Sequence, residues 1–111
     1  MKVEFQKHGS VTVVIPRDAL TEATVPEVQS TFEQETARAA KRLVLEMNDV
    51  PYVDSTGIEF LLAFAGETAT GTMRPRVVGL TDTVREALYI TDTLKRFLLF
   101  DSVEAAVRSF V

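Results

Sequence analysis

Short apolar runs typical of strands alternate with helix-type segments along the chain, and this alternation restricts the possible folds more than any other feature. The first two runs, residues 3–5 and 11–15, flank Gly9-Ser10 and predict two strands joined by a tight turn. Later strands are predicted at residues 43–47, 77–80 and 97–100. Strands that alternate with helices pair in parallel through right-handed crossovers. The sequence therefore predicts one α/β domain of order β-β-α-β-α-β-α-β-α, a mostly parallel sheet that opens with an antiparallel hairpin.

Capping signals and apolar spacing place the helices. Helix starts are predicted at Thr24, near Thr81 and at Asp101, where polar residues precede helical patterns. The helix after residue 54 is predicted to bury one stripe, formed by Ile58, Leu61, Leu62 and Ala65. Polar positions within the strands, Thr12 and Glu46, indicate that one sheet face is only partly covered. We therefore expect the helices mainly on the other face.

Composition excludes several classes of protein. The net charge is −4 at pH 7 and basic residues form no cluster, which argues against a nucleic-acid-binding face. The absence of cysteine excludes disulfides and thiolate chemistry. No apolar stretch approaches the roughly 20 residues needed to cross a bilayer, and residues 1–20 show no secretory signal pattern. We expect a cytoplasmic protein that neither binds nucleic acid nor inserts into a membrane.

The segment most informative about function is Asp49-Val-Pro-Tyr-Val-Asp54-Ser55-Thr56-Gly57-Ile58, between a predicted buried strand and a predicted helix. Unpaired amides and the helix dipole favour anions at a helix N-terminus. A serine there can carry a phosphate, with amides near Gly57 as donors. The alternative is a purely structural role, because Ser and Thr are favoured caps and Thr56-x-x-Glu59 has the pattern of a capping box. Both roles are compatible if one hydroxyl caps the helix and the other stays exposed.

Other candidate sites give weaker indications. Asp49 and Asp54 have no histidine or third acid nearby in sequence, which favours turn and capping roles over catalysis or metal binding. His8, beside the predicted turn, is expected to be solvated. Phe60 and Phe64 are helical neighbours that either pack against an adjacent helix or, if partly exposed, anchor a partner. We expect no enzyme activity, no metal and no cofactor.

The run Asp54-Ser55-Thr56-Gly57-Ile58 resembles the signature of STAS domains, especially those of bacterial anti-sigma factor antagonists. The resemblance extends over nearly the whole chain, including the opening hairpin and the strand at residues 43–47, and it implies one STAS domain at residues 1–111. It also implies partner switching. The resemblance implies that the unphosphorylated protein binds an anti-sigma factor that is itself a serine kinase, and that the sigma factor is released.

The same resemblance assigns roles to individual residues. It implies that the kinase phosphorylates Ser55, with Thr56 as a secondary acceptor, and that a serine phosphatase restores binding. Asp54 and Gly57 would shape the surroundings of the phosphorylated residue.

The loop after the second strand is expected to contact the partner. It reads Pro16-Arg17-Asp18-Ala19-Leu20-Thr21, where relatives commonly have Gly, Leu and Asp. Leu20 and Thr21 are therefore possible partner contacts, although Thr21 stands where the aspartate is expected. Two alternatives of other classes stay open. One is an accessory subunit of a transporter or lipid-trafficking ATPase, and the other is a scaffold module of a stress-sensing complex.

Overall fold

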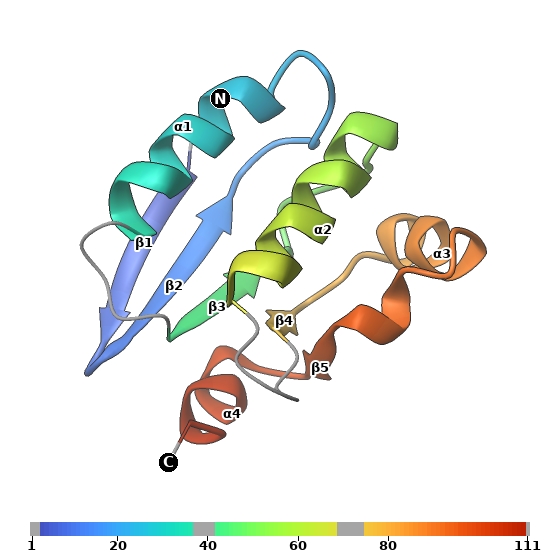
Figure 1. Ribbon diagram of the computed structural model, residues 1–111. Helices are drawn as coiled ribbons and strands as arrows, with labels where there is room; N and C mark the ends of the chain where they lie inside the picture. Colours follow the sequence, from blue (N-terminus) through green and yellow to red (C-terminus); the bar gives the residue numbers. More distant parts are fainter. Residues whose placement is uncertain (1–2, 37–41, 69–74, 111) are drawn as a thin grey trace.

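Five strands form a single sheet in the order β1-β2-β3-β4-β5 in the computed structural model, which describes residues 3–36, 42–68 and 75–110. Strand β1 is antiparallel to β2, and all later neighbours are parallel (Figure 1). The bounds are β1 Val3–His8, β2 Val11–Pro16, β3 Leu43–Glu46, β4 Arg76–Val78 and β5 Leu98–Phe100. The predicted mostly parallel sheet with an antiparallel opening hairpin is confirmed.

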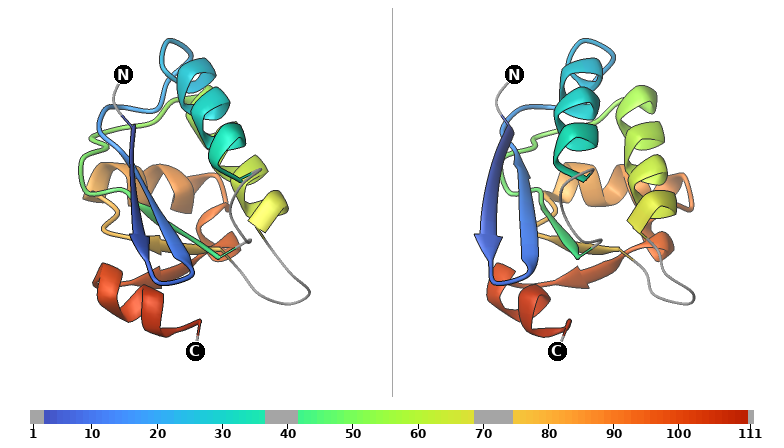
Figure 2. Two further views of the ribbon diagram at one scale, coloured as in Figure 1. Left: turned by 90° about the vertical axis from the view of Figure 1, so that its left-hand side faces the viewer. Right: turned by 60° about the vertical axis from the view of Figure 1, so that its left-hand side comes forward.

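In the described residues, four α-helices connect or follow the strands, and a short 3-10 helix, which was not predicted from the sequence, precedes β5. The bounds are α1 Val25–Thr36, α2 Ser55–Thr68, α3 Asp82–Ile90, η1 Leu94–Arg96 and α4 Val103–Arg108. Helices α1, α2 and α3 cover one face of the sheet, while α4 lies against the other (Figure 2). The expectation that helices gather mainly on one face is therefore confirmed.

Two apolar cores lie on opposite faces of the sheet. Side chains of β3 alternate between them: Leu43 and Leu45 belong to the larger core beneath α1–α3, and Val44 belongs to the smaller core beneath α4. Strand β2 contributes to both cores, and all of its residues are buried. A strand buried on both faces reads as a continuous apolar run, as Val11–Ile15 largely does.

Thr12 does not lie on the partly covered face, where the sequence analysis had placed it. It is 1% exposed, pairs in register with Leu43 and accepts a hydrogen bond from the Nζ of Lys7 at 3.0 Å. Its neighbours in the larger core place it beneath the helices. Glu46 is the better indicator, because it lies on the opposite face from Leu45 and is only half-buried.

Strand β4 is shorter than the predicted 77–80 because Gly79 ends it. Gly79 has φ +74°, a conformation that side-chain-bearing residues rarely adopt. A Cβ at this position would also lie 2.1 Å from the Oδ1 of Asn48, so the backbone approaches the Asn48 side chain closely. The turn at Gly79 directs the chain away from the sheet toward α3.

The buried face of α2 differs from the predicted stripe. It is formed by Gly57, Phe60, Leu61 and Phe64. Ile58 and Leu62 are only half-buried, and the side chain of Ala65 is not among those that the structure describes. The predicted stripe is rotated about the helix axis relative to the buried face, because a helix with so many apolar residues fits more than one stripe.

The caps of α3 and α4 are side-chain hydroxyls. The hydroxyl of Thr81 accepts from the amide of Val84, as the predicted helix start near Thr81 requires. Helix α4 is capped by Ser102, whose hydroxyl accepts from the amide of Ala105 at 3.1 Å, and not by Asp101 as predicted.

The C-terminal end of α4 is held by Arg76, which is 5% exposed. Its guanidinium donates to Ser109 and lies 3.7 Å from the centre of the Phe110 ring.

Candidate functional site

The motif Asp54–Gly57 lies where the chain enters α2, beside the loop that follows β2. The two loops continue the parallel pairing of β2 and β3 beyond the strand ends, through a bridge between Leu20 and Val53. The amide of Leu20 donates to the carbonyl of Tyr52 at 3.2 Å, and the amide of Asp54 donates to the carbonyl of Leu20 at 3.1 Å. Residues far apart in sequence therefore form one surface around the start of α2.

Asp54 is the residue that caps α2. Its Oδ1 accepts the amide of Gly57 at 2.9 Å, three residues on, as an N-cap side chain does. Its Oδ2 accepts the amide of Glu22 in the other loop, also at 2.9 Å. The hydrogen bond from the Glu22 amide, and to a smaller extent the one from the Gly57 amide, lowers the pKa of Asp54 below its usual value. The carboxylate therefore joins two segments as well as capping one helix.

The predicted capping roles of Ser55 and Thr56 are wrong. Helix α2 begins at Ser55, so both residues already belong to its first turn and Asp54 precedes them. Thr56 therefore does not serve as the cap of a capping box with Glu59. The amide of Gly57, expected from sequence to be available to a phosphate, is engaged by Asp54.

Gly57 lies directly against the loop after β2. A Cβ at this position would be 2.2 Å from the carbonyl oxygen of Leu20, far inside the contact distance of real side chains. The carbonyl of Leu20 in turn accepts the amide of Asp54. Because both sides of this contact are backbone, only glycine allows α2 to start so close to residue 20.

Ser55 is exposed and Thr56 is half-buried, so the hydroxyl of the first helical residue is accessible to a partner. Exposed Glu22 and Glu59 lie close by, Glu22 through its bond to Asp54 and Glu59 one turn along α2. Together with Asp54 they make the surroundings of Ser55 acidic. A shallow depression beside Ser55 is lined by Thr21, Glu22, Ala23 and Asp54.

The proposed partner contacts divide into accessible and buried residues. Thr21 is half-buried at the edge of the depression and is available to a partner. The side chain of Leu20 is fully buried, so this residue can offer only its backbone. Phe60 and Phe64 are 5% and 1% exposed and belong to the larger core, which confirms packing and removes them as docking anchors.

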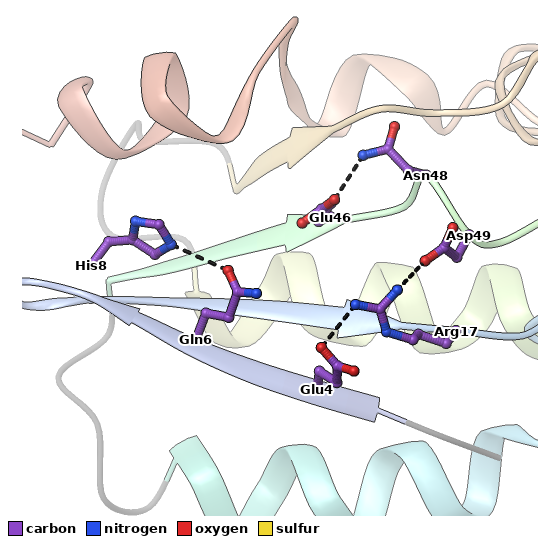
Figure 3. Close-up of polar contacts among 7 residues, drawn as sticks. All are labelled: Glu4, Gln6, His8, Arg17, Glu46, Asn48 and Asp49. Carbon is purple, nitrogen blue, oxygen red and sulfur yellow. Dashed lines mark hydrogen bonds and ion pairs between the residues drawn. The ribbon is translucent and has the colours of Figure 1, made fainter.

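Asp49 and Asp54 do not form a pair. Asp49 is bound to Arg17, whose guanidinium also donates to Glu4 at 2.8 Å (Figure 3). Arg17 thus ties the end of β2 to β1 and to the loop after β3, on the sheet face opposite α1–α3.

His8 is exposed on the same face, as predicted, with one ring nitrogen 3.4 Å from Gln6 Oε1. Within residues 3–36, 42–68 and 75–110, no group of three or more His, Cys, Asp or Glu could hold a metal ion.

Two roles were not predicted from the sequence, namely Asp54 as a double acceptor and Arg17 as a bridge. The cap was within reach, because Asp is among the most favoured N-cap residues and directly precedes the helix. The bond to Glu22 and the bridge of Arg17 join residues 32 positions apart, and no local pattern signals them.

Comparison with known proteins gives one family and a set of similar folds. The family model of the STAS domain matches residues 2–106. An anti-sigma factor antagonist from Mycobacterium paratuberculosis is 21% identical, over 97% of this chain and 92% of that one, with a TM-score of 0.81. The Bacillus cell fate determinant SpoIIAA in its phosphorylated form is 14% identical over 97% and 99% of the two chains, with a TM-score of 0.70.

A membrane protein also contains a similar domain. The murine anion transporter solute carrier 26 family member A9 is 19% identical over 95% of this chain but only 18% of the transporter, with a TM-score of 0.74. At these identities the solved structures establish the fold. The comparison with curated proteins returned no match. None of the helices in the described part of the chain is long and apolar enough to span a membrane.

Replacing Gly57 with alanine tests the close approach of the two loops. Overpacking against the Leu20 carbonyl should lower the free energy of unfolding by about 1–3 kcal/mol, measured by urea denaturation. Ser55→Ala, at an exposed position in the same turn, should change it by less than about 0.5 kcal/mol. A Gly57→Ala protein more stable than the wild type, as helix propensity alone predicts, would contradict the packing argument.

The lowered pKa of Asp54 predicts a pH-dependent contribution to stability. A carboxyl with a depressed folded-state pKa stabilises the fold above its unfolded-state pKa, and this is lost as pH falls through the folded-state value. The difference in urea midpoint between wild type and Asp54→Asn should be largest near neutral pH. It should shrink as the pH falls below about 4. Glu59→Gln, which removes an exposed charge from the same turn, serves as control. A difference that is constant with pH would contradict the prediction.

Proposed function

This chain belongs to the STAS domain family, and from that premise we propose that it is an anti-sigma factor antagonist switched by phosphorylation of Ser55. The observation that carries the proposal is the position of Ser55, an exposed hydroxyl on the first residue of α2, directly after the cap residue Asp54. The similar fold of an anti-sigma factor antagonist from Mycobacterium paratuberculosis supports the same role. The protein acts as a binding module with no chemistry of its own.

The proposed partner is an anti-sigma factor that is also a serine kinase. It contacts the surface formed by residues 21–23 and the first turn of α2, because residues 21–23 line a depression together with Asp54, which directly precedes the exposed Ser55. Binding releases the sigma factor. The kinase then transfers the γ-phosphoryl group of ATP to the Ser55 hydroxyl, and a separate serine phosphatase reverses the modification. Thr56, half-buried beside it, is the secondary acceptor.

The phosphate acts mainly at the interface. A charge near −2 at the start of a helix is favourable for the helix dipole, so α2 is not destabilised. The surroundings of Ser55 are already acidic through Asp54, Glu22 and Glu59, and the phosphate adds to that negative surface. Burying it against the partner costs desolvation, and acidic groups of the partner are repelled.

An accessory role in a transporter is the second candidate. The similar domain within the murine anion transporter is the observation that favours it. The two candidates differ in what the unmodified protein captures. Affinity purification with the Ser55→Ala protein, followed by mass spectrometry, should recover a small serine kinase if the first is correct. Recovery of transporter or lipid-trafficking ATPase subunits in its place would favour the second.

Ser55 is expected to be the principal phosphoacceptor. Incubation with the captured kinase and Mg-ATP, followed by peptide mapping, should place the phosphate on Ser55. Ser55→Ala should abolish most incorporation, whereas Thr56→Val, the control, should keep most of it. Because Asp54 supplies the cap, the free energy of unfolding of Ser55→Ala should lie within about 0.5 kcal/mol of the wild-type value. This variant should also bind the partner constitutively. Phosphate found only at other residues would contradict the assignment.

Phosphorylation should separate binding from folding. We expect phospho-Ser55 protein to keep a near-identical circular dichroism spectrum and a similar or slightly higher melting temperature. Its affinity for the partner should fall at least tenfold, about 1.4 kcal/mol, in isothermal titration calorimetry. If the domain instead loses helix in parallel with binding, the switch is a conformational one and the interface mechanism is wrong.

A further inference from the structure

The Asp54 side chain connects the first turn of α2 to the loop after β2. One carboxylate oxygen accepts the amide of Gly57 and the other accepts the amide of Glu22, each at 2.9 Å. The carboxylate is planar and is attached through only two rotatable bonds, so a rotation that withdraws one oxygen also displaces the other. The two hydrogen bonds are therefore mechanically coupled, although they belong to segments 32 residues apart.

The loop segment held in this way is accessible. Glu22 and Ala23 are exposed, and with Thr21 and Asp54 they line the depression beside Ser55. Leu20, by contrast, is fully buried and bonded through its backbone to Tyr52 and Asp54. The amide of Thr21 is tied to the hydroxyl of Thr24. Beyond Leu20, the bond from Glu22 to Asp54 is thus a link that attaches the outer loop to the α2 side.

We propose that Asp54 is a positioning residue that relays the charge on Ser55 to the segment Thr21–Ala23. A phosphate on Ser55 places about two negative charges and three acceptor oxygens next to the Asp54 carboxylate. It competes for the amides of the first turn and repels the carboxylate, which is partly screened from water by its half-buried position. As the carboxylate rotates away from Gly57, it also releases Glu22. The outer loop loosens while the buried pairing at Leu20 holds.

The relay deepens the proposed function, because it says how the modification reaches surface that the phosphate itself does not occupy. It rests on that function only for the cellular source of the phosphate. Phosphoserine can be inserted at position 55 during translation, without any kinase or partner. The relay can therefore fail while partner switching stands, and the reverse also holds.

The test measures amide hydrogen exchange by NMR in the full chain, with the amide of Leu45 in the buried strand β3 as internal reference. Phosphoserine at position 55 should raise the exchange rate of the Glu22 amide at least fivefold relative to Leu45. Phosphoserine at Ser30, an exposed serine of α1, is the matched control and should change it less than twofold. An unchanged Glu22 amide in the protein carrying phosphoserine 55 would overturn the relay.

A double-mutant cycle then assigns the effect to Asp54. In Asp54→Asn the single amide oxygen can still cap Gly57, while the NH2 group cannot accept from Glu22. This variant alone should raise Glu22 exchange, and phosphoserine 55 added to it should raise it less than twofold further. If Asp54→Asn does not fold, Asp54→Ser, which retains a favoured cap, takes its place. A full phosphate effect in either background would show direct action and overturn the role of Asp54.

Discussion

Burial of strand β2 on both faces is the constraint on which the rest of the structure depends. From Val11 to Pro16 every residue is buried, so neither side of this strand can face water. One face is covered by α1–α3 and the other by α4 and its apolar side chains. Beyond α4, on β1 and β3, the second face carries polar side chains, and Arg17 bridges Glu4 and Asp49 across it. The charged bridge of Arg17 therefore lies on the part of the second face that α4 does not cover.

The position of the candidate site follows from the same strand. Parallel pairing of β2 with β3 continues past the strand ends to Leu20 and Val53, which brings two loops into register. Gly57 lets the first turn of α2 approach the carbonyl of Leu20, and Asp54 bonds to both segments. Ser55 is exposed between Asp54 and Gly57, both of which are engaged with the loop after β2. Accessibility of that hydroxyl is a result of how tightly the surrounding backbone is packed.

Much of the fold could be predicted because its signals are local. Alternating apolar residues such as Leu43 and Leu45 indicated a buried strand, and Thr81 marked a helix start. The errors arose where two local patterns competed. Thr56 fits the pattern of a capping box, but Asp54 precedes the helix and caps it. Thr12 was expected on a partly covered face, but its pairing with Leu43 places it in the interior. The position of the candidate site at a helix start was predictable, whereas the bond between Glu22 and Asp54 required knowledge of long-range pairing.

The division of the interior into two cores has a consequence for how the domain tolerates sequence change. Only the sheet, one layer thick, separates Leu88 and Val84 on one side from Ala106 on the other. Side chains on opposite faces do not share a cavity, so the effects of substitutions in the two cores should largely add. The α4 side, anchored through Arg76 and Phe110, can then drift in sequence without altering the packing beneath α2. The surface around Ser55 is thereby insulated from mutational change on the opposite side of the domain.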